Sequence, residues 1–175
     1  MPIADASPLI YLAKTERLYL LKEFYGLVQI TPSVYREVVV KGEEKGFDDA
    51  IRVKKEIGEY IVLCYPREDR IEKIRRHSVN LGFKLGSGEL ECITLCIDAD
   101  DKIFLSDDDD AKEFAKNYGI DGRGTIYLLL KSYEKGFFNK NECAKTFENM
   151  IDKGFWVNPG VIKVFYKTLE KIGKF

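Results

Sequence analysis

The sequence has few of the residues that several common active sites require. His77 is the only histidine in 175 residues and no Gly-x-Ser-x-Gly segment occurs, so a Ser-His-Asp hydrolase is not expected. The four cysteines form no Cys-x-x-Cys pair, which argues against a structural zinc site. Cys92 and Cys96 lie four residues apart on one face of a predicted helix, and we interpret them as buried core thiols.

Long apolar runs are also missing. No segment approaches the roughly 20 apolar residues that a membrane-spanning helix needs. Residues 1–14 lack the basic start and the long apolar stretch of a secretion signal, so we expect a soluble cytoplasmic protein with no membrane partner. Gln29 is the only glutamine, and lysine and glutamate supply most of the 33% of charged residues, a bias that predicts a thermophilic source.

Length and composition predict one globular domain over residues 1–175, with 45% of its residues hydrophobic. Apolar segments typical of strands lie at 2–6, 27–31, 61–66 and 101–106. Helical spacing occurs at 7–26, 32–42, 47–60, 67–82, 87–98, 109–119, 125–136, 139–154 and 158–173. Strands that alternate with helices predict an α/β fold, a three-layer α/β/α arrangement around a central parallel sheet, followed by a helical C-terminal extension at about 137–175.

Acidic residues follow two of the predicted strands. Asp5 ends the first strand, and Asp107 and Asp108 follow the fourth. Ligands of open parallel sheets bind beyond the carboxyl ends of the strands, so these carboxylates face one crevice if the two strands are neighbours. Glu37 and Glu89, on the helices after the second strand and before the fourth, can both point into it.

Such a cluster needs compensation. Two carboxylates about 4 Å apart repel by roughly 4 kcal/mol at an effective dielectric constant near 20. No arginine or lysine lies beside Asp5 or Glu89 in the sequence to offset this repulsion. Mg²⁺ and Mn²⁺ prefer hard oxygen ligands, and a metal-bound water can attack phosphorus. Joint placement of the acids therefore predicts a metal site.

Each acid also has an ordinary structural interpretation. Asp5 fits a turn or helix cap, Glu37 an exposed helix residue, and Glu89 a first-turn residue that complements the helix dipole. Asp107 or Asp108 fits a helix cap, and Asp109 and Asp110 are interpreted as solvated.

Several segments together resemble PIN domains, metal-dependent nucleases that include the VapC-type toxin ribonucleases. The matching segments are IADASPLIYLAK, TPSVYREVV, LGSGELECITLC, IFLSDDDDAKEFAKNYGI and GRGTIYLLLKSYEKG. They cover most of residues 1–136. Glu89 departs from the pattern, because many members have aspartate there. The aspartate run leaves the fourth acid open between Asp107 and Asp108.

The resemblance implies a PIN-like, Rossmann-type fold and an endoribonuclease that uses Mg²⁺ or Mn²⁺. It assigns catalysis to Asp5, Glu37, Glu89, Asp107 and Asp108, and the metal to Asp5, Glu89, Asp107 and Asp108, with Ser7 in a supporting role. It also implies RNA as substrate, an antitoxin partner and a homodimer. The alternative is a catalytically weak PIN-like module that binds RNA or protein. A receiver domain fits poorly, because the chain reads LCYPRED where an acceptor aspartate would follow the third strand. A haloacid-dehalogenase-type phosphatase fits poorly, because the first strand ends in Asp-Ala-Ser rather than Asp-x-Asp.

Basic residues supply candidate RNA contacts. Arg75 and Arg76 lie on a predicted basic helix, Lys112 follows the aspartate run, and Arg123 precedes a helix that begins with Thr125. Lysine and arginine side chains of this kind bind phosphates beside an acidic site. The alternative interpretation is a solvated helix face.

Overall fold

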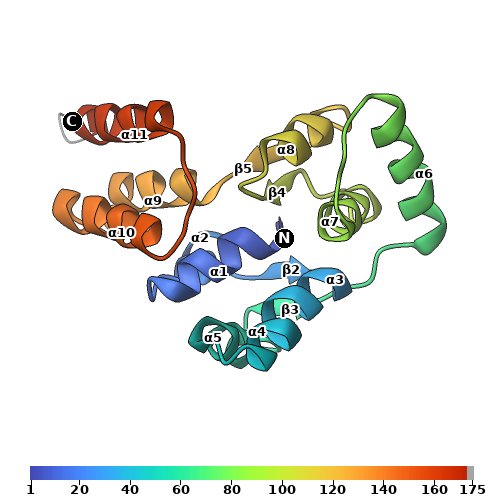
Figure 1. The fold of residues 1–175 in the computed structure, drawn as a ribbon, viewed down its shortest axis with the longest axis horizontal. Helices are drawn as coiled ribbons and strands as arrows, with labels where there is room; N and C mark the ends of the chain where they lie inside the picture. Colours follow the sequence, from blue (N-terminus) through green and yellow to red (C-terminus); the bar gives the residue numbers. More distant parts are fainter. Residues whose placement is uncertain (173–175) are drawn as a thin grey trace. The chain divides into compact units, whose positions relative to one another are not determined.

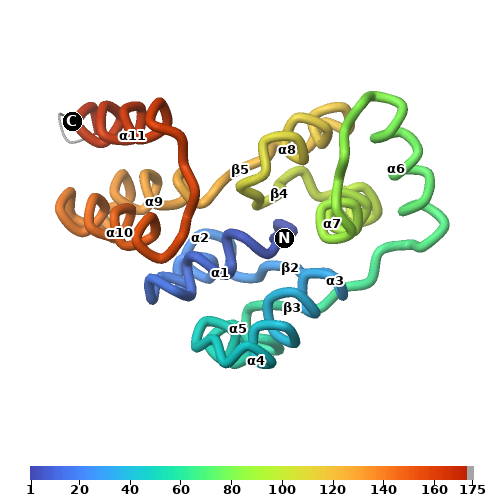
Figure 2. The backbone as a smooth tube through the Cα atoms, in the orientation of Figure 1, coloured from blue at the N-terminus to red at the C-terminus, as the bar shows by residue number. Residues whose placement is uncertain are grey.

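A computed structural model of the chain describes residues 1–172 and separates into two compact units, Met1–Gly124 and Thr125–Phe175. Figures 1 and 2 show the elements of each unit in chain order. The second unit begins ahead of the C-terminal extension that the sequence predicts.

A parallel sheet of five strands forms the centre of the first unit (Figure 1). Its order is β3-β2-β1-β4-β5, and its strands are β1 (Ile3–Ala4), β2 (Val28–Ile30), β3 (Ile61–Leu63), β4 (Ile103–Leu105) and β5 (Asp121–Arg123). Ala4 is in register with Leu105, which confirms that the first and fourth predicted strands are neighbours. The predicted α/β/α fold is therefore correct.

Burial explains why the short strands are stable. Ile3, Val28, Ile30 and Phe104 are fully buried, as expected for parallel strands covered by helices on both faces. β5 was not predicted, because Asp-Gly-Arg has no apolar residue and depends on pairing with β4.

The helical elements of the first unit follow the predicted order. They are α1 (Ala6–Lys14), α2 (Leu20–Tyr25), α3 (Pro32–Tyr35), the π-helical segment η1 (Arg36–Val40), α4 (Lys41–Glu44), α5 (Asp48–Glu56), α6 (Glu68–Asn80), α7 (Ser87–Asp98) and α8 (Asp109–Lys116). α7 packs against β1 and β4, and α1 packs against α5 and η1. Cys92 and Cys96 are buried in α7, as predicted.

Two local predictions are wrong. The predicted helix at 7–26 is interrupted, because Glu16 adopts a left-handed φ of 59° and the Thr15 hydroxyl donates to the Tyr11 carbonyl at 2.7 Å. Ser87, which the sequence suggests as N-cap of the helix at 87–98, is instead the first helical residue of α7, and the N-cap is Gly86.

The second unit is helical in its described part. It contains α9 (Thr125–Glu134), α10 (Lys140–Asp152) and α11 (Pro159–Ile172). The predicted capping box is present: the Glu142 N–H donates to Asn139 Oδ1 at 2.9 Å, and the Asn139 N–H donates to Glu142 at 2.8 Å. Phe147 of α10 stacks on Phe165 of α11 with ring centroids 3.9 Å apart.

Two limits apply to the helices. Within residues 1–172, no helix combines the length and the apolar character that crossing a membrane would require. The predicted end of the last helix at position 173 lies outside the described residues.

Candidate active site

Asp5 lies where β1 ends and α1 begins. Its backbone N–H donates to the Leu105 carbonyl at 2.8 Å, and its Oδ1 accepts from the Ala6 N–H at 2.8 Å. The residue is only 7% exposed. Burial, and then the charges of Glu89 and Glu37, raise the pKa of Asp5 to about 7, although the bond from Ala6 lowers it. Asp5 is thus a carboxyl group that is difficult to ionise without a nearby cation.

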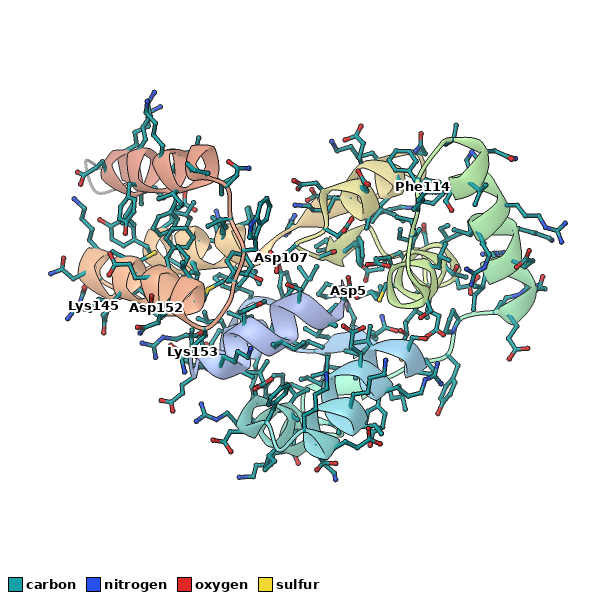
Figure 3. The ribbon with its side chains drawn as sticks, in the orientation of Figure 1. Asp5, Asp107, Phe114, Lys145, Asp152 and Lys153 are labelled. Atoms are coloured by element: carbon teal, nitrogen blue, oxygen red, sulfur yellow. The ribbon has the colours of Figure 1, made fainter. Side chains whose placement is uncertain are left out.

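Two serine hydroxyls connect the carboxyl ends of β1 and β4. Ser106, which is fully buried, donates from Oγ to Asp5 Oδ2 at 3.3 Å and accepts from the Asp108 N–H at 3.1 Å. Ser7 Oγ donates to Asp107 Oδ2 at 2.8 Å. Asp5 and Asp107 accordingly follow paired strands at the same end of the sheet (Figure 3). Ser7 contacts Asp107 rather than the first aspartate.

The aspartate run divides into different roles. Asp108 caps α8, because its Oδ1 accepts from the Ala111 N–H at 2.6 Å. Asp107 is partly buried and bonded to Ser7, so it is the member that is directed toward α1. Asp109 and Asp110 are exposed, as the solvated interpretation predicts.

Glu89 occupies the first turn of α7. Burial is the main reason that its pKa is raised, and the charges of Asp108 and Glu37 add to the effect. The backbone N–H groups of Glu89 and Gly86 donate to this carboxylate and oppose the shift. Glu89 therefore combines an acidic surrounding with a capping role at its own helix.

Glu91, two residues after Glu89, is a weaker candidate for the same site role on sequence grounds. In the structure it makes a structural contact. Its Oε2 accepts from the Ser33 N–H at 2.8 Å and its Oε1 accepts from Ser33 Oγ at 2.6 Å. Glu91 thus fixes α7 to the start of α3.

Glu37 enters from the π-helical segment η1. The residue is exposed, while Val38 and Val39 beside it are buried and hold the segment in place. Short π-helical turns occur frequently at functional sites because they change the direction of side chains. The charge of Glu37 adds a smaller contribution than burial to the raised pKa values of Asp5 and Glu89, and Glu37 lines a groove together with Ser7.

Glycines allow the close approach of the acids. A Cβ on Gly88 would lie 3.2 Å from Asp5 Oδ1, and a Cβ on Gly124 would lie 2.9 Å from Asp107 Oδ1. A Cβ on Gly86 would lie 2.6 Å from Glu89 Oε2. Backbone at the start of α7 and directly after β5 therefore occupies the space that a side chain would otherwise fill.

The acids have little positive compensation. Within residues 1–172, no ion pair involves Asp5, Glu37 or Glu89. A Cβ on Gly124 would lie 2.9 Å from Asp107 Oδ1 and 3.8 Å from Lys112 Nζ, so this lysine lies near Asp107, and it pairs with Asp109 at 2.9 Å.

The donor set fits a hard divalent cation in chemical type. The donors are carboxylate and hydroxyl oxygens, and the buried Asp5 carboxyl has a raised pKa that a cation would lower. In the described part of the chain, no three His, Cys, Asp or Glu side chains are close enough together to form a ligand group. Mg²⁺ is commonly bound by one or two carboxylates together with water and substrate phosphates, so these residues suit a site that the substrate completes.

The basic residues predicted to contact RNA already have acidic neighbours. Arg75 and Arg76 both lie beside Glu72 on the exposed α6, at 3.5 and 3.2 Å. Arg123 lies 2.7 Å from Asp121. Lys112 pairs with Asp109, so each of the four predicted RNA contacts has an acidic neighbour.

Sequence reasoning missed Ser106 and the glycines at the site. Ser106 stands directly between β4 and the aspartate run, and a small hydroxyl residue at a strand end was the available signal. The Gly-Ser-Gly start of α7 was read only as a helix entrance, although two of its glycines approach carboxylates.

Comparison with known proteins identifies one relationship. The family model that describes a PIN domain matches residues 1–171. A search of curated proteins finds no significant match.

Proposed function

Because the chain belongs to the PIN-domain family, whose members are generally nucleases, we propose that it is a metal-dependent endoribonuclease that hydrolyses RNA phosphodiester bonds. We assign Mg²⁺ or Mn²⁺ binding to Asp5, Glu89, Asp107 and Asp108. Glu37 completes the catalytic set, and Ser7 supports the site through Asp107.

Asp5 carries the proposal. Asp5 is only 7% exposed, and burial, with smaller contributions from the charges of Glu89 and Glu37, raises its pKa to about 7, so its ionised form is unfavourable for folding alone. Perturbed pKa values of this origin cluster at functional sites. A structural ion pair would offer another explanation, but none involves Asp5 within residues 1–172.

The side chains divide the work of hydrolysis. A divalent cation, when bound, supplies the positive charge that lets an anionic phosphodiester approach these acids and that activates water for attack. We assign the role of proton acceptor to the exposed Glu37, which lines a groove together with Ser7. Ser7 and Ser106 hold the carboxylates of Asp107 and Asp5 in place.

Cleavage of a fluorescent single-stranded RNA tests the proposal. We expect turnover with Mg²⁺ or Mn²⁺, none in EDTA, and a loss on the order of 100-fold or more for Asp5→Asn or Glu89→Gln, since each removes charge at the metal. Mn²⁺ binding measured by electron paramagnetic resonance should weaken in the same variants.

Matched substitutions keep this test specific. Asp110→Asn and Glu44→Gln make the same chemical changes at exposed positions outside the site and should leave the rate unchanged. Equal cleavage in EDTA, or full activity of Asp5→Asn, would show that the nuclease proposal is wrong.

A catalytically weak binding module is the second candidate. The capping role of Glu89, and the separation of the acids within residues 1–172, favour it. RNA binding that survives Asp5→Asn, with no turnover in Mn²⁺ at any protein concentration, would establish this alternative.

Toxin function is a finer part of the proposal. It rests on the resemblance to VapC-type proteins and includes an antitoxin partner and a homodimer. Light scattering of the purified protein tests the homodimer. Growth arrest on expression, relieved by Asp5→Asn, tests toxicity.

A further inference from the structure

A groove of about 620 Å³ opens beside the acidic site. One wall is a face of α1, and the other is formed by η1, α4 and the segment that leads into α5. Its volume lies within the range of about 300–1,000 Å³ that small ligands occupy, enough for about one or two nucleotides.

Along the α1 wall, the lining residues run from Ser7, beside the acidic site, to the positively charged Lys14. Ser7, Tyr11 and Lys14 lie four and three residues apart, which places them on one face of the helix. Ser7 holds Asp107 at the acidic end. Lys14 Nζ lies 5.1 Å from the centroid of the Tyr11 ring, one turn further along.

The opposite wall shows the same order of charge, with an acidic residue followed by lysines. Glu37, Lys41 and Lys45 line the groove at intervals of four residues, with the acid first and the two cations after it. Lys45 Nζ lies 6.0 Å from the centroid of the exposed Phe47 ring. No salt bridge among the described residues involves Lys41 or Lys45.

Close packing fixes the backbone that carries Lys41. Gly42 approaches α5 so closely that a Cβ there would lie 2.6 Å from the Ala50 Cβ. The two helices can meet only because position 42 has no side chain, and the flanking lysine at position 41 is thereby held at the groove. The wall is thus a built feature rather than a chance row of surface charges.

One buried acid lies in the groove beyond Glu37. Asp49 is 8% exposed and sits in the first turn of α5, where the helix dipole favours a carboxylate. Burial raises the pKa of Tyr11, the charges of Asp107 and then Asp49 add to the shift, and Tyr11 and Asp49 line the same groove. A carboxylate only accepts hydrogen bonds, which suits a ribose hydroxyl rather than a phosphate.

We infer that this groove binds a single-stranded RNA segment adjoining the phosphate that is cleaved, with Lys14, Lys41 and Lys45 contacting backbone phosphates and Tyr11 and Phe47 stacking on bases. The inference rests on the proposed nuclease function, because it places the strand relative to that site. Cations with aromatic rings between them are the arrangement that binds single strands without sequence preference. Arg75 and Arg76, by contrast, share the acidic neighbour Glu72 and are not among the groove residues.

Fluorescence anisotropy of a labelled oligouridylate in EDTA tests the inference without cleavage. We expect Lys14→Gln/Lys41→Gln/Lys45→Gln to weaken binding on the order of tenfold at low salt, and to reduce the slope of log affinity against log salt by about two, since each single-strand phosphate contact contributes about 0.7. The single variant Lys41→Gln should reduce the slope by about 0.7. Its exposed side chain makes misfolding an inadequate explanation.

Two further variants act as controls. Lys163→Gln/Lys167→Gln/Lys171→Gln removes the same charge from exposed positions of α11, and Arg75→Gln/Arg76→Gln tests α6. Both should change affinity much less than the groove variant. Equal losses in the α11 variant, a larger loss in the α6 variant, or unchanged affinity in the groove variants would overturn the inference. Because binding is measured in EDTA, an inactive protein whose groove lysines still control affinity would refute only the nuclease function.

Discussion

The two compact units bury different chemistry. The first unit buries the carboxyl groups of Asp5 and Asp49, whereas the buried polar residues in the described part of the second unit are only Thr125, Ser132 and Thr146. In the second unit, Phe147 and Phe165 stack in an apolar core. Burying a carboxyl group costs free energy, while burying an aromatic ring gains it. The buried carboxyl groups therefore lower the folding stability of the first unit, whereas the second unit has an ordinary apolar core.

The largest expected change in stability lies in the second unit. Phe147→Ala should lower the free energy of unfolding by about 3–5 kcal/mol, because it removes a fully buried ring and leaves a cavity. Urea unfolding measures the change. Val164→Ala, at a side chain that is 62% exposed, should change it by less than about 0.5 kcal/mol. Similar effects of both substitutions would contradict a packed core here.

Substitution of Asp5 should raise the free energy of unfolding rather than lower it. Its carboxyl ionises near pH 3.8 in the unfolded chain and near pH 7 in the folded one, so between these values the folded state holds a proton that the unfolded state has lost. The stability contributed by this group is complete below pH 3.8 and is lost as the pH rises through 7. In EDTA, Asp5→Asn should therefore stabilise the protein by up to about 4 kcal/mol at pH 8, and by almost nothing at pH 4.

Urea unfolding from pH 4 to pH 8 measures the difference between wild type and Asp5→Asn. Asp110→Asn is the control, because that side chain is exposed. Added Mn²⁺ should stabilise wild type at pH 8 but leave Asp5→Asn unchanged, since only binding to the folded state shifts the equilibrium. A wild type that gains stability relative to Asp5→Asn as the pH rises would contradict the argument.

The smallest expected effect compares two matched glycines. Gly88 of α7 and Gly160 of α11 both lie in the first turn of a helix, and an added Cβ would lie 3.2 Å from Asp5 Oδ1 and 3.0 Å from Asn158 Oδ1, respectively. Gly88→Ala should slow RNA cleavage about tenfold, equivalent to about 1.4 kcal/mol, because it displaces Asp5. Gly160→Ala should leave cleavage unchanged. Equal rates in both variants would show that Asp5 tolerates displacement.

The strands and most helices were predictable because their signals are local. Ile3, Val28, Ile30 and Phe104 belong to short apolar runs, and Asn139 with Glu142 shows the capping-box spacing. The break at Glu16 was not predictable from periodicity, because Leu18 and Leu21 continue the helical spacing beyond it. β5 depends on a neighbouring strand rather than on its own residues.

The candidate site divides in the same way. The acids were found because they follow strands or begin helices, which are positions that the sequence reveals. Ser106 and Gly88 were missed because their contacts with Asp5 join residues far apart in the chain. The sequence does not single out Lys41 and Lys45, because an exposed lysine on a helix usually indicates only a solvated surface. The groove that they line, and in which we propose that they bind RNA, forms between separate helices.

Three acids of the candidate site also accept backbone N–H groups at helix starts. Asp5, Glu89 and Asp108 each accept backbone N–H groups at the start of a helix, so these side chains have partners before any ion arrives. We therefore expect the protein to fold without metal, unlike a zinc finger, which is unfolded without its ion. We expect chelation to abolish the proposed nuclease activity without unfolding the protein, and we expect added metal to restore that activity at once.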